Sequence, residues 1–143
     1  MKPGKPLVLV AEDEPVLLEL FSTVLSKRGF SVIKVRNGVE AVQRYFQVLE
    51  RGIKPALVLM DHRMPVKNGL EAAKEILEKD GSAKILFVSA DISVRGEAMG
   101  IGAVGFLEKP VLVGRLLSKI GEVLTAPGDG LPVPGWLSGG GAC

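Results

Sequence analysis

The sequence predicts an α/β fold in which a parallel sheet carries helices on both faces. Two observations lead to this fold class. Short apolar runs recur along the chain, and each is followed by a stretch whose apolar residues have helical spacing. Strands buried on both faces of a parallel sheet have this apolar character. The connections are short, as expected for strands and helices that alternate in five consecutive strand–helix units.

The first unit begins with an apolar strand at residues 7–10, extended by Ala11. Three acidic residues follow and then Pro15, which is suited to the first turn of a helix. Apolar side chains then recur at helical spacing until Gly29, a typical helix end. These inward positions are Leu17, Leu20, Phe21, Val24 and Leu25.

Residues 30–35 form the second predicted strand, and Asn37 with Glu40 three residues later resembles a capping box at a helix start. The apolar positions of this helix are Val39, Val42, Phe46 and Leu49. The third strand covers residues 56–60 and ends at Asp61. A loop then leads to a third helix whose inward positions are Leu70, Ala73, Ile76 and Leu77.

The fourth and fifth strands are expected at residues 85–88 and 104–107. Residues 92–101, between them, are expected to be helical, although Gly96 and Gly100 weaken this helix. The last helix begins near Val111, and its inward side consists of Leu112, Leu116, Leu117, Ile120, Val123 and Leu124.

Length and composition favour one domain followed by a tail. The chain has 143 residues and a net charge of +2, which argues against direct binding to nucleic acid or to a membrane. We expect residues 1–125 to form the domain and the Gly/Pro-rich residues 126–143 to be flexible or introduced by cloning. The single cysteine, Cys143, excludes an intrachain disulfide, and the apolar run near the N-terminus is too short for a signal peptide or membrane span. A cytoplasmic location is therefore predicted.

Polar residues follow four of the five predicted strands. Glu12 and Asp13 follow the first strand, Asp61 the third, Ser89 the fourth, and Lys109 lies two residues after the fifth. Ligands of open α/β sheets bind beyond the carboxyl ends of the strands, so these side chains are expected to converge there. Taken singly, each has an ordinary interpretation as a helix-start acid, a turn former, a capping hydroxyl or a surface lysine. Their joint placement favours a site.

Three crowded carboxylates repel one another unless a cation compensates them, and Mg²⁺ prefers oxygen ligands of this kind. Lys109 adds a positive charge for a phosphoryl oxygen, and Ser89 adds a hydroxyl donor. This equipment suits phosphoryl transfer, in which positioning and charge neutralisation provide most of the catalysis. A carboxylate beside the metal can itself be the nucleophile, and Asp61, alone at the end of the central strand, is the best candidate.

Four segments of the chain closely resemble the receiver domain of two-component response regulators, the CheY-like family. They are residues 8–15 (VLVAEDEP), 57–69 (LVLMDHRMPVKNG), 86–90 (LFVSA) and 105–110 (GFLEKP). The segments occur in the family's order and at suitable spacing over residues 6–125. The resemblance implies a flavodoxin-like (βα)₅ fold, a doubly wound parallel sheet with strand order 2-1-3-4-5.

The resemblance also assigns roles to the residues at the strand ends. Asp61 matches the phosphoacceptor, and Glu12 and Asp13 match the acidic pair around Mg²⁺. Arg63 occupies the position whose backbone carbonyl completes the metal site in the family. Lys109 matches the lysine that contacts the phosphoryl group.

Further matches concern switching. Ser89 matches the switch hydroxyl and Phe106 the aromatic switch position, although Phe106 lacks the hydroxyl of the common tyrosine. Family members usually have a cis bond at the position of Lys109 and Pro110. The chain also departs from the common pattern at Glu12, where aspartate is frequent and the longer side chain would still permit metal binding, directly or through water.

Three further features of the sequence bear on the site. Arg63 and Asp91 each lie two residues beyond a site residue, and they would either pair across the pocket mouth and limit water access or remain solvated charges. His62, next to Asp61 on an extended backbone, should point away from it and is not expected to act as a base. Residues 100–105 match G-x-G-x-x-G, but they precede a strand instead of opening a helix and are rejected as a dinucleotide site.

Together these observations predict a phosphorylation-dependent signalling switch and not an enzyme with its own substrate. A histidine kinase or histidine phosphotransfer protein would phosphorylate Asp61 with Mg²⁺, and a downstream protein would bind the face formed by the fourth helix, fifth strand and fifth helix. The expected protein is a stand-alone or excised receiver without an output domain. The alternatives are a phosphorylation-independent binding module of the same fold and, less favoured, a Mg²⁺-dependent aspartyl phosphatase.

Overall fold

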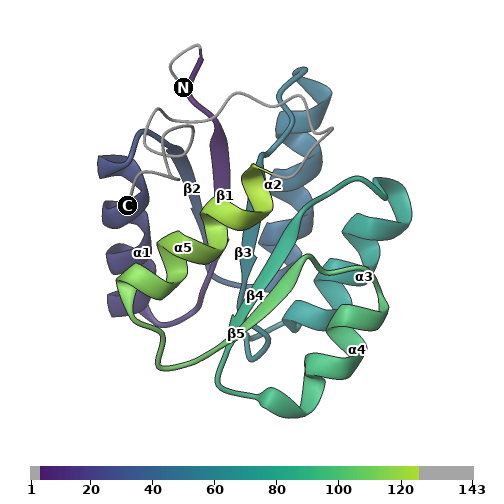
Figure 1. Cartoon of the computed structure of the whole chain (residues 1–143). Coiled ribbons are helices and arrows are strands. Elements are labelled where there is room, and N and C mark those ends of the chain that lie inside the picture. The colour runs from purple at the N-terminus through teal and green to yellow at the C-terminus, as the bar shows by residue number, and fades with distance from the viewer. Residues whose placement is uncertain (1–3, 126–143) are drawn as a thin grey trace.

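The structure is a computed structural model that describes residues 4–125. Its five parallel strands form one sheet in the order β2-β1-β3-β4-β5, so the predicted flavodoxin-like fold is confirmed (Figure 1). The elements are β1 (Leu7–Ala11), α1 (Pro15–Lys27), β2 (Ser31–Val35), α2 (Gly38–Glu50), β3 (Leu57–Met60), α3 (Gly69–Lys79), β4 (Ile85–Ser89), α4 (Arg95–Gly100), β5 (Gly105–Glu108) and α5 (Val113–Leu124). The predicted tail at residues 126–143, with Cys143, lies outside the described residues. Within residues 4–125, no helix is both long enough and apolar enough to cross a membrane.

The strand order places a switch point between β1 and β3. The chain passes from β1 to β2 on one side and then crosses to β3 on the other side. In the register of the sheet, Ala11 lies beside both Val35 and Met60. The residues that follow β1 and β3 therefore leave the sheet at the same level, next to the crevice where open α/β sheets bind ligands.

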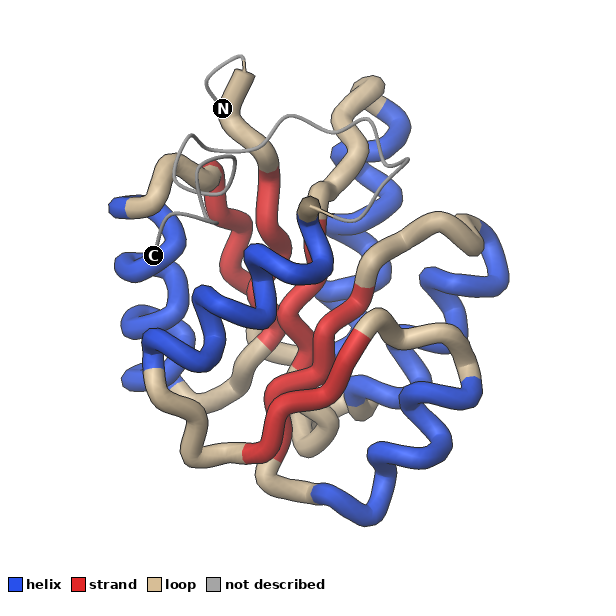
Figure 2. Tube along the Cα trace, viewed as in Figure 1, coloured by secondary structure: helices blue, strands red, loops and turns tan. Residues whose placement is uncertain are grey.

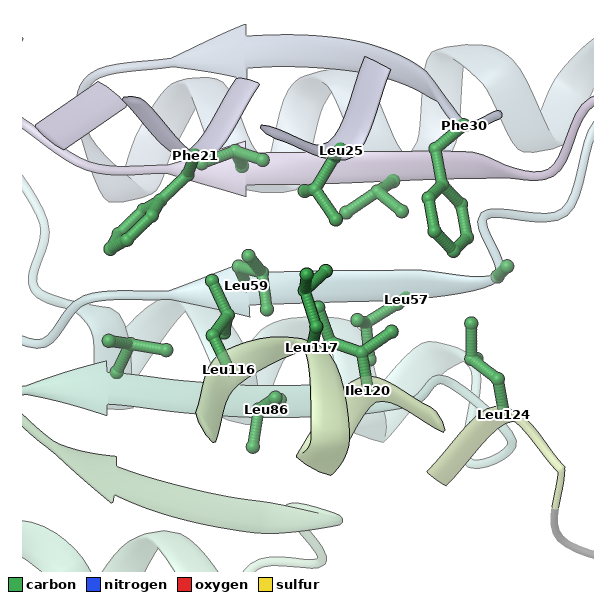
Figure 3. Close-up of a cluster of buried hydrophobic side chains, with 14 of the residues drawn as sticks. Phe21, Leu25, Phe30, Leu57, Leu59, Leu86, Leu116, Leu117, Ile120 and Leu124 are labelled. Atoms are coloured by element: carbon green, nitrogen blue, oxygen red, sulfur yellow. The ribbon is translucent and has the colours of Figure 1, made fainter. Parts of the chain in front are cut away.

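Helices cover both faces of the sheet and form two separate cores. Helices α1 and α5 pack on one face, and α2, α3 and α4 pack on the other (Figures 1 and 2). Figure 3 shows the first core, in which Phe21 and Leu25 of α1 and Ile120 of α5 lie over the leucines of β3. Every residue of β1, β3 and β4 is buried, which agrees with their continuous apolar sequences.

The buried face of α2 differs by one position from the predicted face. Its buried residues include Ala41, Tyr45 and Val48, whereas the predicted Val42, Phe46 and Leu49 are only partly buried against the same core. The prediction failed because it counted tyrosine as an outward residue. Tyr45 is fully buried, and its hydroxyl donates a 2.6 Å hydrogen bond to Asp80, which lies 35 residues away in the sequence.

Two predicted core positions, Leu20 and Leu112, are wrong. Leu20 is 42% exposed, and Leu18 is the residue of α1 that is buried against the sheet in its place. Leu112 is 80% exposed, because α5 begins at Val113 and Leu112 is its N-cap residue, with an extended backbone. An N-cap residue does not share the face of the helix that follows it.

Side-chain caps set the starts of α2 and α3. Asn37 accepts the Glu40 backbone N–H at 2.9 Å, but the Glu40 carboxylate accepts the Arg36 N–H, so only half of the predicted capping box forms. The complete box occurs at α3, where Asn68 accepts the Glu71 N–H and the Glu71 side chain accepts the Asn68 N–H. Both caps lie at the carboxyl end of the sheet, where the candidate site is.

The segment after β4 is less regular than the single helix predicted over residues 92–101. A 3₁₀ helix at Ile92–Val94 precedes a six-residue α4, and Ala98 is the one buried residue of the two helices. Asp91 accepts the Ser93 N–H and hydroxyl, which favours the initial turn over an α-helical start. With two glycines and little burial, α4 has weak intrinsic and tertiary support.

At the opposite edge of the sheet, Asp80 connects α2, α3 and the loop before β3. It accepts hydrogen bonds from the Tyr45 hydroxyl, from the Lys54 ammonium at 2.5 Å, and from the Ser82 backbone and hydroxyl. Burial alone would raise the pKa of Asp80, but the hydrogen bonds from Lys54, Tyr45 and Ser82 hold that pKa well below its ordinary range. The network fixes the end of the molecule that lies away from the site.

We predict that Tyr45→Phe lowers the free energy of unfolding by about 1.5–3 kcal/mol near pH 7, because a hydrogen bond to a charged carboxylate is lost. Urea unfolding measures this change. Since the pKa of Asp80 is lower in the folded state, the ionised carboxylate stabilises the protein above about pH 4, and this contribution is lost as the pH falls further. Lys54 and Ser82 keep the Asp80 pKa low in the variant too, so the difference between the two proteins should shrink only well below about pH 4, where Asp80 becomes protonated in the folded proteins. A pH-independent difference would contradict this explanation.

Candidate functional site

Three carboxylates meet beyond the carboxyl ends of β1 and β3. Oxygen atoms of Glu12, Asp13 and Asp61 all lie within 4.8 Å of one another. Glu12 and Asp61 are buried, and Asp13 is half-buried. Backbone hydrogen bonds fix the two buried acids, because the Glu12 N–H donates to Val35 and the Asp61 N–H donates to Ala11. The convergence predicted from the strand ends is present in the structure.

Lys109 compensates this negative charge from the end of β5. Its ammonium donates to Glu12 at 2.7 Å and to Asp61 at 3.3 Å. The second Glu12 oxygen accepts the Glu14 backbone N–H at 3.1 Å. Both oxygens of Glu12 therefore have a donor, and the lysine contacts this acid more closely than it contacts Asp61.

Burial and charge shift the pKa of two of these groups. Burial raises the pKa of Glu12, and the nearby Asp61 charge adds to this effect, so the pKa lies above its ordinary value despite the hydrogen bond from Lys109. Burial alone would lower the pKa of Lys109, but hydrogen bonds and charges from Glu12 and Asp61 outweigh burial and raise the pKa. The lysine is therefore protonated at neutral pH and serves as a fixed positive charge.

The loop after β3 (residues 61–68, the β3–α3 loop) presents Asp61 to the site. The Asp61 carboxylate accepts the His62 backbone N–H at 2.8 Å, while the His62 ring accepts the Leu70 N–H at the start of α3. His62 thus points away from the carboxylates, as expected. Among the backbone hydrogen bonds of residues 4–125, none uses the Arg63 carbonyl, which is consistent with its predicted use as a ligand.

Arg63 and Asp91 form an ion pair between the β3–α3 loop and the loop after β4. The Arg63 Nε lies 3.4 Å from an Asp91 oxygen, and the arginine side chain is 79% exposed. Hydrogen bonds from Ser93 lower the pKa of Asp91, and the contact with Arg63 adds to this effect. The predicted pairing of Arg63 with Asp91 is therefore present, and its effect on water access stays a prediction.

The side chains of Ser89 and Phe106 have no described contact with the cluster of carboxylates. The fully buried Ser89 hydroxyl accepts the Asp91 backbone N–H at 3.1 Å, and its described contacts include neither the carboxylates nor the ammonium of Lys109. The half-buried Phe106 ring stacks on Phe87 at a centroid distance of 6.2 Å. The peptide bond between Lys109 and Pro110 is cis.

An apolar cleft beside Lys109 was missed by the sequence analysis. It has a volume of about 260 Å³ and is lined by Leu17, Phe21, Ala90, Lys109, Pro110 and Val111. Its walls come from α1, the end of β4 and the segment before α5, three parts of the chain that are distant in the sequence. No local pattern indicates such a cleft, because Leu17 and Phe21 were already explained as core positions and the other lining residues come from distant segments.

The arrangement fits a hard divalent cation. Carboxylate oxygens, here from three acids of which two are buried, are the ligands that Mg²⁺ takes in proteins. One Asp61 oxygen accepts the His62 N–H, and the other accepts a hydrogen bond from Lys109. Glu12, Asp13 and Asp61 are therefore the residues able to hold such an ion. The Lys109 ammonium adds a positive charge beside Asp61.

Comparisons with known proteins point to one family. The family model of the response regulator receiver domain matches residues 8–121. The chemotaxis protein CheY of Thermotoga maritima is 34% identical over 119 residues, which are 81% of this chain and 95% of that protein. CheY of Bacillus subtilis is 33% identical over 120 residues, which are 82% of this chain and 96% of that protein. A crystal structure of the response regulator TrrA from Thermotoga maritima in complex with Mg²⁺–BeF is 30% identical, with a TM-score of 0.73, and the match covers 83% of this chain and 99% of that one.

We predict that Mg²⁺ affinity decreases as the pH falls through mildly acidic values. Because burial raises the pKa of Glu12, a proton competes with the cation at a pH where an exposed glutamate is still ionised. Calorimetric titration with Mg²⁺ at several pH values measures the effect. Glu12→Gln should bind Mg²⁺ more weakly and with a flatter pH dependence, and an unchanged pH profile in this variant would contradict the assignment to Glu12.

Proposed function

We propose that this chain, which belongs to the response regulator receiver domain family, is a phosphorylation-dependent switch of a two-component system. Asp61 would accept the phosphoryl group from a histidine kinase or a histidine phosphotransfer protein. The observation that carries this proposal is the buried Asp61 carboxylate, placed between two further acids and the ammonium of Lys109. That arrangement supplies both a nucleophile and the positive charge that phosphoryl transfer requires.

In the proposed reaction, a bond forms between an Asp61 oxygen and phosphorus, and the bond between phosphorus and the donor's imidazole nitrogen breaks. The product is an acyl phosphate, and the donor's ring, already protonated at its other nitrogen, keeps the electron pair of the broken bond and leaves as neutral imidazole. Glu12, Asp13, Asp61 and the Arg63 carbonyl would hold Mg²⁺, which neutralises charge on the carboxylates and the phosphoryl oxygens when bound. The complex of the similar TrrA protein with Mg²⁺–BeF supports this assignment.

Two residues beside the cluster would transmit the modification. The Ser89 hydroxyl accepts the Asp91 N–H, so its own proton remains available for a phosphoryl oxygen. Movement of Ser89 toward the phosphoryl group would draw the loop after β4 inward, and Phe106 would follow. The weakly supported α4 would respond to this movement, and the face formed by α4, β5 and α5 would contact the downstream protein.

The other two functions have less support. A phosphorylation-independent binding module needs the fold alone and does not require three acids and a lysine to converge. An aspartyl phosphatase usually has a second acid two residues after the nucleophile, but this chain has Arg63 at that position, mostly exposed and paired with Asp91. The proposed switch therefore catalyses only its own phosphorylation and dephosphorylation.

We predict that the protein forms a covalent phospho-adduct when incubated with Mg²⁺ and acetyl phosphate. Intact-mass spectrometry measures the adduct, which should be absent in Asp61→Asn and in samples treated with EDTA. A missing adduct in the unsubstituted protein, together with intact folding, would favour the binding module. Sustained turnover of unrelated phosphate esters would instead favour the phosphatase.

We further predict that Arg63→Ala shortens the lifetime of the phosphorylated state. If the ion pair with Asp91 limits access of water to the acyl phosphate, its loss should speed dephosphorylation by up to about fivefold, the factor that corresponds to the ~1 kcal/mol limit of an exposed pair. Decay of the adduct after removal of acetyl phosphate measures the rate. Arg44→Ala, at an exposed position of α2, is the control. Equal rates for Arg63→Ala and the control would show that the pair does not restrict water.

A further inference from the structure

The start of α2 is in close backbone contact with the β3–α3 loop. The Gly38 backbone N–H donates a 2.9 Å hydrogen bond to the Lys67 carbonyl. A β-carbon at position 38 would overlap this carbonyl oxygen and would lie 2.9 Å from both the carbonyl carbon and the β-carbon of Lys67. Only glycine permits this approach, because the atoms in the way belong mostly to the backbone and cannot rotate aside.

The loop has a strained turn at the same point. Val66 has a φ of 72°, and Lys67 donates its N–H to the Pro65 carbonyl at 2.8 Å, which closes a γ-turn around the valine. A β-branched residue rarely adopts such a φ. Val66 is 83% exposed, so its own side chain does not hold the turn in place. The neighbouring Lys67 does so through its bond to Gly38 and its ion pair with Glu75 of α3.

Contacts of Gly69, directly after the β3–α3 loop, connect this turn to Asp61. Gly69 donates its N–H to the His62 carbonyl at 2.8 Å, and a β-carbon at position 69 would overlap the Asp61 carbonyl oxygen. The loop is therefore closed on itself next to Asp61 and is held from outside at Lys67. If Lys67 moves, the short segment that includes the Arg63 carbonyl must therefore change its conformation.

We infer that Gly38 is a positioning residue for the proposed metal and phosphorylation site. Through its contact with Lys67, Gly38 holds the β3–α3 loop in the conformation that presents Asp61 and the Arg63 carbonyl together. Gly38 touches neither the metal nor the phosphoryl group. The inference rests on the proposed function, because it concerns the placement of residues assigned there.

Gly38→Ala tests this inference, with Gly114→Ala as the matched control. Both glycines lie in the first turn of a helix, but a β-carbon at position 114 would meet nothing within 4 Å. We expect Gly38→Ala to raise the Mg²⁺ dissociation constant about tenfold, the lower part of the range for residues that position metal ligands. Gly114→Ala should leave this constant unchanged. Calorimetry at a temperature well below both melting temperatures gives the two values.

The rate of labelling by acetyl phosphate separates a positioning role from general damage. At saturating Mg²⁺, Gly38→Ala should regain most of the labelling rate of the unsubstituted protein, because excess cation restores the metal-bound loop. A variant damaged throughout would stay slow at every Mg²⁺ concentration. A wild-type dissociation constant in folded Gly38→Ala, or slow labelling that Mg²⁺ does not rescue, would overturn the inference.

Amide hydrogen exchange in the unsubstituted chain tests the same coupling if Gly38→Ala does not fold. Coupling between two equilibria is reciprocal, so a hydrogen bond that favours metal binding must be strengthened by the metal. Exchange of the Gly38 amide should slow severalfold at saturating Mg²⁺, while exchange of the Leu116 amide, which is bonded to Leu112 at the start of α5, should not change. Equal exchange of Gly38 with and without bound Mg²⁺ would overturn the inference. Absence of any Mg²⁺ binding would instead overturn the proposed function and this inference with it.

Discussion

The contact of Lys109 with Glu12 and Asp61 is the interaction on which the site depends. Two buried carboxylates and a third beside them repel one another strongly in surroundings of low dielectric constant. The ammonium, bonded to both buried acids, offsets this repulsion and allows the acids to stay close in the absence of a metal. The ion pairs also join the ends of β1, β3 and β5. The charges to which we assign the proposed phosphoryl transfer therefore also hold the ends of these strands together.

The two edges of the sheet differ in how firmly they are held. At the edge away from the site, Asp80 joins α2, α3 and the loop before β3 through several hydrogen bonds. At the site edge, α4 has six residues and one buried side chain. Cooperative folding needs only part of the structure to be strongly stabilised, and segments that move in signalling come from the weakly stabilised part. This division would suit the proposed switch, in which one end of the molecule changes conformation while the rest stays folded.

The hydrogen bond between Lys109 and Glu12 is a feature of the site that the sequence motif around Glu12 does not reveal. A glutamate reaches one methylene farther than the aspartate frequent at this position, and here both of its oxygens already have donors, Lys109 and the Glu14 N–H. A cation entering the site has to compete with these donors for Glu12, whereas Asp13 is more open. Glu12 therefore links the proposed metal site to Lys109, the lysine proposed to contact the phosphoryl group.

Sequence periodicity alone determined the five alternating units, and strand-end residues alone indicated where the site would form. Both patterns follow from local rules, namely that doubly buried strands are apolar and that parallel strands end together. The family resemblance supplied the strand order, which no local pattern contains. Tertiary structure decided which side of α2 is buried, because Tyr45 becomes a core residue only where Asp80 meets its hydroxyl. It likewise decided that Gly38 must be glycine, since the Lys67 carbonyl that excludes a side chain there is 29 residues away in the chain and adjacent only after folding.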